Sequence, residues 1–162
     1  MLFRSIIQKV LTQNPGATIL YNAITSKVVS DTINKMGGKG IRTKVGHSFI
    51  KAEMKKHDAV FACEHSGHFY FNSNYNADSG LIAALTALGI ISESTATLSQ
   101  LCESLRNKYF NSGEINFHIK NTKQAMDAVS QSFSDGKQDQ LDGLTITYPG
   151  WWLNIRSEEH TS

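Results

Sequence analysis

The chain of 162 residues contains only two cysteines and two prolines, and its formal net charge is only +2. The cysteines, Cys63 and Cys102, lie far apart and form no Cys-x-x-Cys pair. This favours buried thiols in a reduced, cytoplasmic protein over a disulfide framework. The small charge gives no reason to expect a nucleic-acid or membrane partner. No apolar run approaches the length of a membrane span, and no cleavable signal stands at the start.

Strand and helix signals alternate over the first half of the chain. Strands are predicted at residues 17–21, 40–45, 59–62 and 69–71. Helices are predicted at residues 27–36, capped by Thr25 or Ser26, and at residues 48–56, capped by Ser48. This alternation is typical of a parallel α/β layer, in which ligands bind beyond the carboxyl ends of the strands. Three loops, at residues 22–26, 44–48 and 64–68, are therefore expected to share one edge of the sheet.

The second half of the chain shows a different pattern. A helix at residues 81–88, ended by Gly89, and a helix at residues 98–109 come first. The Asp78 carboxylate could cap the first of these helices or join the site, and capping is the favoured role. A strand is then predicted at residues 114–119 and a helix at residues 122–133. Leu144, Ile146 and Tyr148 alternate with threonines before the Pro149-Gly150 turn, which predicts an antiparallel hairpin. These elements indicate a small α+β domain with an antiparallel sheet.

A thiol, a carboxylate, a hydroxyl and two imidazoles stand close together in the stretch Cys63-Glu64-His65-Ser66-Gly67-His68. Its carboxylate, hydroxyl and imidazoles provide hydrogen-bond acceptors, donors and a group that exchanges protons near neutral pH. Such a loop suits a polyhydroxylated ligand, although its spacing alone is equally consistent with a plain polar hairpin turn. Lys44 and His47, on the loop at 44–48, would face it across the same edge.

Two other chemistries for this stretch are disfavoured. A metal site made from Cys63, Glu64, His65 and His68 would need adjacent side chains to converge, but successive side chains of a strand point apart. Cys63 could be a nucleophile beside a histidine, but nothing in the sequence marks an oxyanion hole. A buried position in the strand is the better prediction for Cys63.

Several motifs occur in the same order as in one enzyme family. Glu64-His65-Ser66-Gly67-His68, with Arg42-Thr43-Lys44-Val45-Gly46-His47-Ser48 upstream, resembles the α-D-phosphohexomutases, the four-domain phosphomannomutases and phosphoglucomutases. Ala77-Asp78-Ser79-Gly80, Asp142-Gly143-Leu144 and Trp151-Trp152-Leu153 continue the resemblance over nearly the whole chain. The resemblance implies a three-layer-like α/β third domain at residues 6–92, a linker helix region at 93–110, and a truncated α+β fourth domain at 111–155.

The resemblance also implies a reaction and a division of roles. The family interconverts hexose 6-phosphate and hexose 1-phosphate, of mannose or glucose, through a bisphosphorylated sugar. A phosphoserine and an aspartate loop that binds Mg²⁺ lie in domains that this chain lacks, so the chain alone is expected to be inactive. The implied partners are a hexose phosphate and the other domains of the same full-length chain. The alternatives are a non-catalytic sugar-phosphate-binding module or, less favoured, a small metal-binding domain.

The residues of this chain that match the family's site can be named one by one. His68 and His47 are candidates for proton exchange, and Arg156 is a candidate phosphate ligand. No metal ligand is expected within the chain. Ile24 departs from the pattern, because some members of the family have a basic residue there. The predicted substrate-binding residues are Lys44, His47, Glu64, His65, Ser66, Gly67, His68 and Arg156.

The two ends of the chain look foreign to this pattern. The codons AGA TCG GAA GAG encode Arg-Ser-Glu-Glu, as at residues 156–159, and their reverse complement encodes Leu-Phe-Arg-Ser, as at residues 2–5. We therefore predict that residues 1–5 and 156–162 are adapter-derived and that the native part is residues 6–155, with Arg156 ambiguous.

Overall fold

A five-stranded sheet organises the first half of the chain in the computed structural model, which describes residues 2–106 and 110–157. β1 (Thr18–Asn22) pairs in parallel with β2 (Lys39–Thr43) and with β3 (Phe61–Cys63). β4 (Phe69–Phe71) and β5 (Ala77–Asp78) follow as antiparallel strands, giving the order β2-β1-β3-β4-β5. The sheet is therefore mixed rather than parallel throughout, because a short turn between β3 and β4 can only join antiparallel strands.

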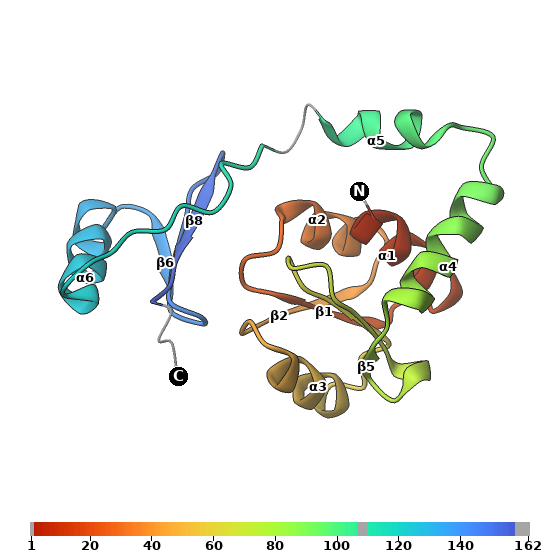
Figure 1. The fold of residues 1–162 in the computed structure, drawn as a ribbon, viewed down its shortest axis with the longest axis horizontal. Helices are drawn as coiled ribbons and strands as arrows, with labels where there is room; N and C mark the ends of the chain where they lie inside the picture. Colours follow the sequence, from red (N-terminus) through yellow and green to blue (C-terminus); the bar gives the residue numbers. More distant parts are fainter. Residues whose placement is uncertain (1, 107–109, 158–162) are drawn as a thin grey trace. The chain divides into compact units, whose positions relative to one another are not determined.

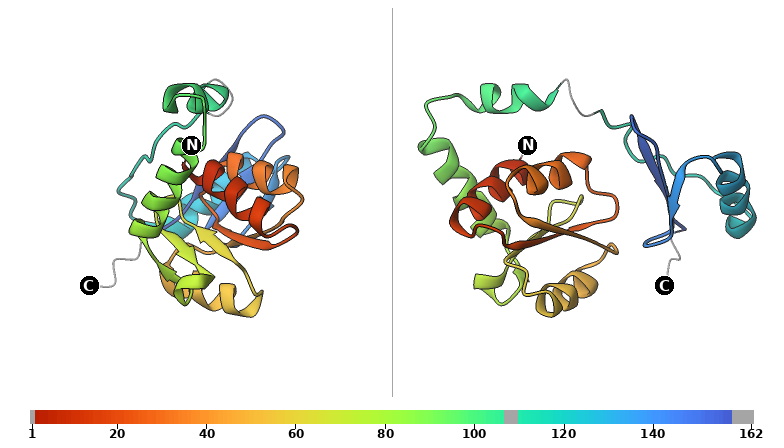
Figure 2. Two further views of the ribbon diagram at one scale, coloured as in Figure 1. Left: turned by 90° about the vertical axis from the view of Figure 1, so that its right-hand side faces the viewer. Right: turned by 180° about the vertical axis from the view of Figure 1, so that it is seen from behind.

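Helices cover both faces of this sheet (Figure 1). α1 (Leu2–Gln13) and α2 (Lys27–Lys35) lie on one face, and α4 (Gly80–Ser92) packs against α1. α3 (His47–Lys56) covers the opposite face, as both views in Figure 2 show. The predicted three-layer α/β/α arrangement is confirmed.

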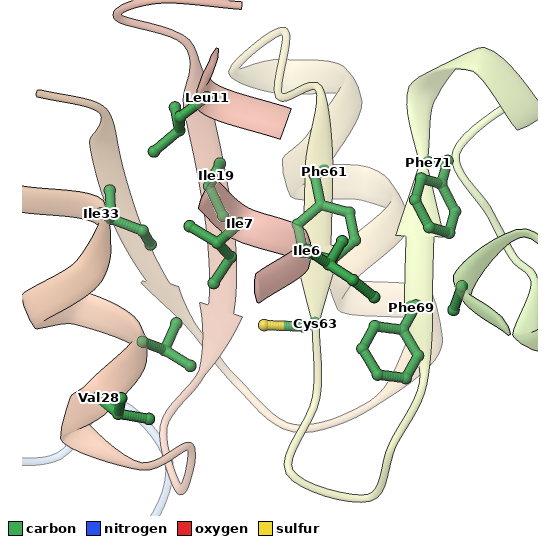
Figure 3. Close-up of a cluster of buried hydrophobic side chains, with 12 residues drawn as sticks. Ile6, Ile7, Leu11, Ile19, Val28, Ile33, Phe61, Cys63, Phe69 and Phe71 are labelled. Carbon is green, nitrogen blue, oxygen red and sulfur yellow. The ribbon is translucent and has the colours of Figure 1, made fainter. Parts of the chain in front are cut away.

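Two apolar clusters hold the three layers together. One joins α1 and α2 to the sheet through fully buried side chains such as Ile7, Ile33 and Phe61 (Figure 3). The other joins α3 to the opposite face through Ile50 and Tyr70. Burial of such side chains is worth roughly 1.5–3 kcal/mol each, so both faces of the sheet are anchored.

A smaller antiparallel sheet lies in the second half of the chain. β7 (Leu144–Thr147) pairs with β6 (Lys137–Asp139) on one side and with β8 (Trp152–Ile155) on the other, and α6 (Thr122–Ser132) precedes them. The β7–β8 hairpin and the small α+β domain are thus confirmed. The chain divides into two compact units, residues 1–111 and 112–162, which are called the first and second units below.

Several local predictions were wrong. Residues 114–119 form no strand, and Ile115 and Phe117 are exposed. α4 continues past Gly89 to Ser92, since one glycine costs a helix only about 1 kcal/mol. β6 was not predicted, because Lys137, Gln138 and Asp139 carry no apolar signal.

The helix caps were predicted only in part. Ser26 caps α2 as expected, by accepting from the backbone N–H of Val28. α3, however, begins after Gly46 without any side-chain cap, so Ser48 is not its cap. Ser79, not Asp78, caps α4.

The remaining elements fall near the predicted positions. The short 3-10 helix η1 (Asn72–Asn74) joins β4 to β5. α5 (Leu98–Arg106) matches the start of the helix predicted at 98–109, whose residues 107–109 lie outside the described part. Residues 2–5, predicted to be foreign, form the first turn of α1, and the Phe3 ring centroid lies 5.1 Å from that of Phe69. Within the described residues, no helix is long and apolar enough to cross a membrane.

Candidate functional site

The three loops predicted to share an edge do meet beyond the carboxyl ends of β1, β2 and β3. Register places Asn22 of β1 opposite Thr43 of β2, and Tyr21 opposite Cys63, the residue before Glu64. Loops 22–26, 44–48 and 64–68 therefore begin at the same level of the sheet. This place is called the loop edge below.

The carboxylate of Glu64 ties these loops together. Its Oε1 accepts from the backbone N–H of Gly46 at 3.0 Å and from the amide of Asn22 at 3.5 Å, and its Oε2 accepts from the hydroxyl of Tyr70 at 2.6 Å. Glu64 is only 3 % exposed. Burying a charged carboxylate costs free energy unless hydrogen-bond donors surround it, and here three separate segments of the chain provide those donors.

The position of Gly46 explains why a carboxylate is suitable here. Gly46 is the residue before α3, and its N–H points at Glu64 from the amino end of that helix, where the helix dipole favours negative charge. Its φ of 125° is in the region that favours glycine. Glu64 thus accepts from the N–H of the residue that precedes α3, from 18 residues away in the chain.

Asn22 forms the second connection between loops. Its Oδ1 accepts from the backbone N–H of His65 at 3.4 Å and from the hydroxyl of Thr25, while its amide nitrogen faces Glu64. Both Asn22 and Thr25 are buried. The loop at 22–26 is therefore held to the loop at 64–68 through both the oxygen and the nitrogen of the Asn22 amide.

The outer part of loop 64–68 is open to solvent. His65, Ser66, Gly67 and His68 are all exposed, and the Ser66 hydroxyl lies 2.7 Å from Nδ1 of His68. The backbone N–H of Gly67 donates to the Glu64 carbonyl at 3.0 Å, which closes a tight turn in which Gly67 has a φ of 89°. A hydroxyl and an imidazole are thus presented together on a loop whose base is fixed.

Two more predicted residues lie on loop 44–48. His47 is exposed at the first position of α3, directly after Gly46. The ammonium of Lys44 lies 5.8 Å from the centre of the Phe49 ring, which is a weak cation–π contact at an exposed position.

Asp78 supports the far side of the loop rather than capping a helix. Its Oδ1 accepts from the backbone N–H of Phe69 at 2.8 Å. Phe69 directly follows His68, so this bond fixes the end of the loop next to that imidazole. The antiparallel return of β5 along β4 brings Asp78 to the loop edge.

The side chain of Cys63 does not lie at the loop edge. Figure 3 shows its side chain among the apolar side chains of the core. Burial first, and then the charge of Glu64, raises the pKa of its thiol well above the ordinary range, so the thiolate nucleophile is disfavoured. In the part of the chain that the structure describes, no group of three or more His, Cys, Asp or Glu side chains is arranged to hold a metal ion.

Arg156, the predicted phosphate ligand, belongs to the second unit. Its guanidinium lies 3.6 Å from Oδ2 of Asp142, at the open end of the β7–β8 hairpin, opposite the turn. Arg156 therefore belongs to a different unit from the other predicted site residues. Those that the structure brings to the loop edge are Lys44, His47, Glu64, His65, Ser66, Gly67 and His68.

The sequence did not point to Tyr70. It stands between two phenylalanines in an apolar strand, and alternation gives no hint that its hydroxyl reaches Glu64. Asn22 lies in a loop that was predicted to join the edge, but its side chain was not singled out. Its position directly after an apolar strand was the available signal.

Comparison with known proteins identifies the family. The family model described as phosphoglucomutase/phosphomannomutase, alpha/beta/alpha domain III, matches residues 2–109. The chain belongs to this family.

Relatives and solved structures agree with this assignment. The chain is 39 % identical to a phosphomannomutase of Methanocaldococcus jannaschii over 151 residues, which is 93 % of this chain and 33 % of that protein. It is 34 % identical to a phosphomannomutase of Escherichia coli over 149 residues, again 33 % of that protein. A crystal structure of a phosphoglucomutase/phosphomannomutase family protein from Burkholderia thailandensis superposes with a TM-score of 0.82 at 29 % identity, covering 97 % of this chain and 34 % of the other. The chain spans about a third of the length of these relatives.

Proposed function

We propose that this chain is the sugar-binding portion of a phosphohexomutase that interconverts hexose 6-phosphate and hexose 1-phosphate, of mannose or glucose. The observation that carries the proposal is the loop edge itself, where Glu64 fixes three loops and Ser66, His68 and His47 are exposed. Relatives named phosphomannomutase supply the substrate class.

Phosphoryl transfer depends mainly on positioning and on stabilising charge. The sugar has to be presented in two orientations, so the loop has to hold hydroxyls that both orientations share. Ser66 donates to or accepts from such a hydroxyl, and Gly67 lets the backbone approach the ring. His68 or His47 exchanges a proton at the reacting oxygen, because an imidazole can both accept and donate a proton. Direct contact of Glu64 with sugar hydroxyls stays a prediction, because its carboxylate accepts three hydrogen bonds from within the protein.

The remaining parts of the reaction are assigned to domains outside this chain. A phosphoserine there would donate and accept the phosphoryl group, and Mg²⁺ there would help to stabilise its charge. Mg²⁺ takes near-octahedral oxygen ligands, and the donor set at the loop edge does not fit it. The Glu64 carboxylate is buried and accepts three hydrogen bonds, and the Asp78 carboxylate accepts from the backbone N–H of Phe69. In this proposal, the residues of this chain bind and orient the sugar phosphate, and one of them moves a proton.

A segment exchange tests this proposal. In the Methanocaldococcus jannaschii phosphomannomutase, the matched segment is replaced by residues 6–155 of this chain, and conversion of mannose 1-phosphate is followed. We expect an active enzyme. An exchange enzyme that folds but does not convert mannose 1-phosphate would favour the alternative of a non-catalytic sugar-phosphate-binding module. Turnover by the 162-residue chain alone would contradict the division of roles.

Variants of the exchange enzyme test the individual roles. His68→Ala removes a group that exchanges a proton and is expected to lower kcat by about 10²–10⁴. Glu64→Ala is expected to lower kcat/KM roughly tenfold to a hundredfold. His57→Ala is the matched control, because His57 lies at the opposite end of α3 and contacts Glu53 there. Equal kcat for the His68→Ala and His57→Ala enzymes would remove loop 64–68 from the site.

A further inference from the structure

Tyr70 carries the only hydroxyl on β4, between Phe69 and Phe71. Its ring packs in the apolar cluster under α3 and is fully buried. A phenylalanine would fill that cluster equally well, so packing does not account for the hydroxyl. The hydroxyl donates instead to Oε2 of Glu64 at 2.6 Å, a short bond to a charged acceptor.

This bond determines how the Glu64 carboxylate is turned. With Oε2 held by Tyr70, Oε1 is directed to the N–H of Gly46 and to the amide of Asn22. Without the Tyr70 hydroxyl, the carboxylate can rotate about its last bond. Oε1 would then leave the N–H of Gly46, the residue that precedes His47.

Asn22 passes the same constraint to the other loop. Its amide orientation is set by the hydroxyl of Thr25, which donates to Oδ1, and by Glu64, which accepts from Nδ2. The same Oδ1 accepts from the backbone N–H of His65. The position of the exposed loop 64–68 therefore depends on a side chain that is itself only 1 % exposed.

The environment of these groups makes them difficult to replace by water. Asn22, Thr25 and Glu64 are three of the few buried polar residues of the first unit. Burial, and then the hydrogen bond to Glu64, raises the pKa of Tyr70, so its hydroxyl stays a donor at neutral pH. A buried acceptor that loses a donor is not readily compensated by solvent.

We propose that Tyr70 and Asn22 are positioning residues: acting through the Glu64 carboxylate, they hold the three loops of the edge in the geometry that receives the hexose phosphate. The inference rests on the proposed function for the identity of the ligand. It assigns Tyr70 and Asn22 no contact with the substrate.

The test uses the 162-residue chain as wild type, Tyr70→Phe and Asn22→Ala, with Tyr21→Phe as the matched control. Tyr21 is a partly buried tyrosine on β1 whose hydroxyl interacts with Ser30, away from Glu64. Amide hydrogen exchange is measured by NMR, and affinity is measured by titration with mannose 6-phosphate. Each variant is compared at a temperature where it is fully folded.

We expect the amides of Gly46 and His65 to exchange roughly tenfold faster in Tyr70→Phe, while the core amides of Leu20 and Ala62 are unchanged. Affinity for mannose 6-phosphate is expected to fall roughly fivefold to twentyfold. A purely structural role would accelerate the core amides as well and leave the affinity of the folded protein unchanged. Asn22→Ala is expected to show the same pattern, with the larger change at His65.

A double-variant cycle tests whether Tyr70 acts through Glu64. In a Glu64→Gln background, Tyr70→Phe is expected to cause less than a twofold further loss of affinity. Full additivity, or identical behaviour of Tyr70→Phe and Tyr21→Phe, would overturn the inference. Failure of the wild type to bind mannose 6-phosphate would instead count against the proposed function, and the exchange rates of Gly46 and His65 would then decide on the positioning role alone.

Discussion

The two units of this chain are stabilised in different ways. The first unit buries apolar side chains on both faces of its sheet, under α1 and α2 and under α3. In the described part of the second unit, the buried residues are Leu144, Thr145 and Ile146, all on β7, and α6 buries none of its residues. A site whose geometry must hold to fractions of an ångström needs supporting side chains that cannot shift. The first unit can therefore supply such support by itself.

The polar contacts differ in the same way. At the loop edge, Glu64 bonds to Gly46 and Asn22, which are 18 and 42 residues away. In the second unit, Asn154 bonds to Asp142 and Thr145, within a single hairpin. Long-range bonds connect separate loops, whereas bonds within a hairpin stabilise one local element.

The largest expected effect concerns the core of the first unit. Phe61 is fully buried, with its ring centroid 5.2 Å from that of Phe71, and Phe61→Ala is expected to cost about 3–5 kcal/mol of unfolding free energy. Both tryptophans lie in the second unit, so their fluorescence in urea reports that unit, while far-UV circular dichroism also reports the first. We expect the loss of unfolding free energy to appear in the transition followed by circular dichroism. An equal loss in the fluorescence transition would show that the two units unfold together.

Two glycines provide the next comparison. A Cβ on Gly143 would lie 2.2 Å from the carbonyl oxygen of Ile155, and its φ is 71°, so Gly143→Ala is expected to destabilise the second unit by about 3–4 kcal/mol. Gly67 also has a positive φ, but a Cβ there would meet nothing within 4 Å, so Gly67→Ala should cost the first unit only about 1–2 kcal/mol. Urea unfolding measures both. Equal costs would show that the collision in the hairpin is relieved by movement of β8.

The smallest expected effect is a dependence on pH. Burial, and then Glu64, raises the pKa of Tyr70 in the folded state above the ordinary value near 10. The unfolded tyrosine therefore loses its proton first, so this group's stabilisation is complete below about pH 10 and is lost as the pH rises towards the folded pKa. Between pH 9 and pH 11, the wild type should lose about 1 kcal/mol more unfolding free energy than Tyr70→Phe. Parallel losses would show that the hydroxyl ionises freely in the folded protein.

The meeting of the three loops was predictable because it follows from strand order. Alternating strands and helices place the loops after β1, β2 and β3 on one side, whatever side chains they carry. The turn at residues 64–68 and the β7–β8 hairpin were also marked by local residue types. Those features depend on nearest neighbours in the chain, which the sequence shows directly.

The features that were not predictable depend on partners distant in sequence. Ser48 was predicted as a cap because a hydroxyl near a helix start usually serves as one, but α3 begins after Gly46 without a side-chain cap. The N–H of Gly46 bonds to the Glu64 carboxylate, which lies 18 residues further along the chain. Asp78 likewise bonds to Phe69 across the β4–β5 pair rather than to its own helix. Residues 114–119 alternate as a strand does, but alternation specifies only a face and provides no neighbouring strand to pair with.

The bonds of Glu64 also have a consequence for the order of events in folding. The segments that it joins are brought together only when β1, β2 and β3 have paired, and closing such long loops is entropically unfavourable until those contacts form. A chain that has made only its helices or its β3–β4 hairpin would therefore not have the three loops of the edge in register. A sugar phosphate bound at this edge would select the completed sheet and stabilise it in proportion to the logarithm of its concentration, so that the ligand acts as a folding cofactor of the first unit.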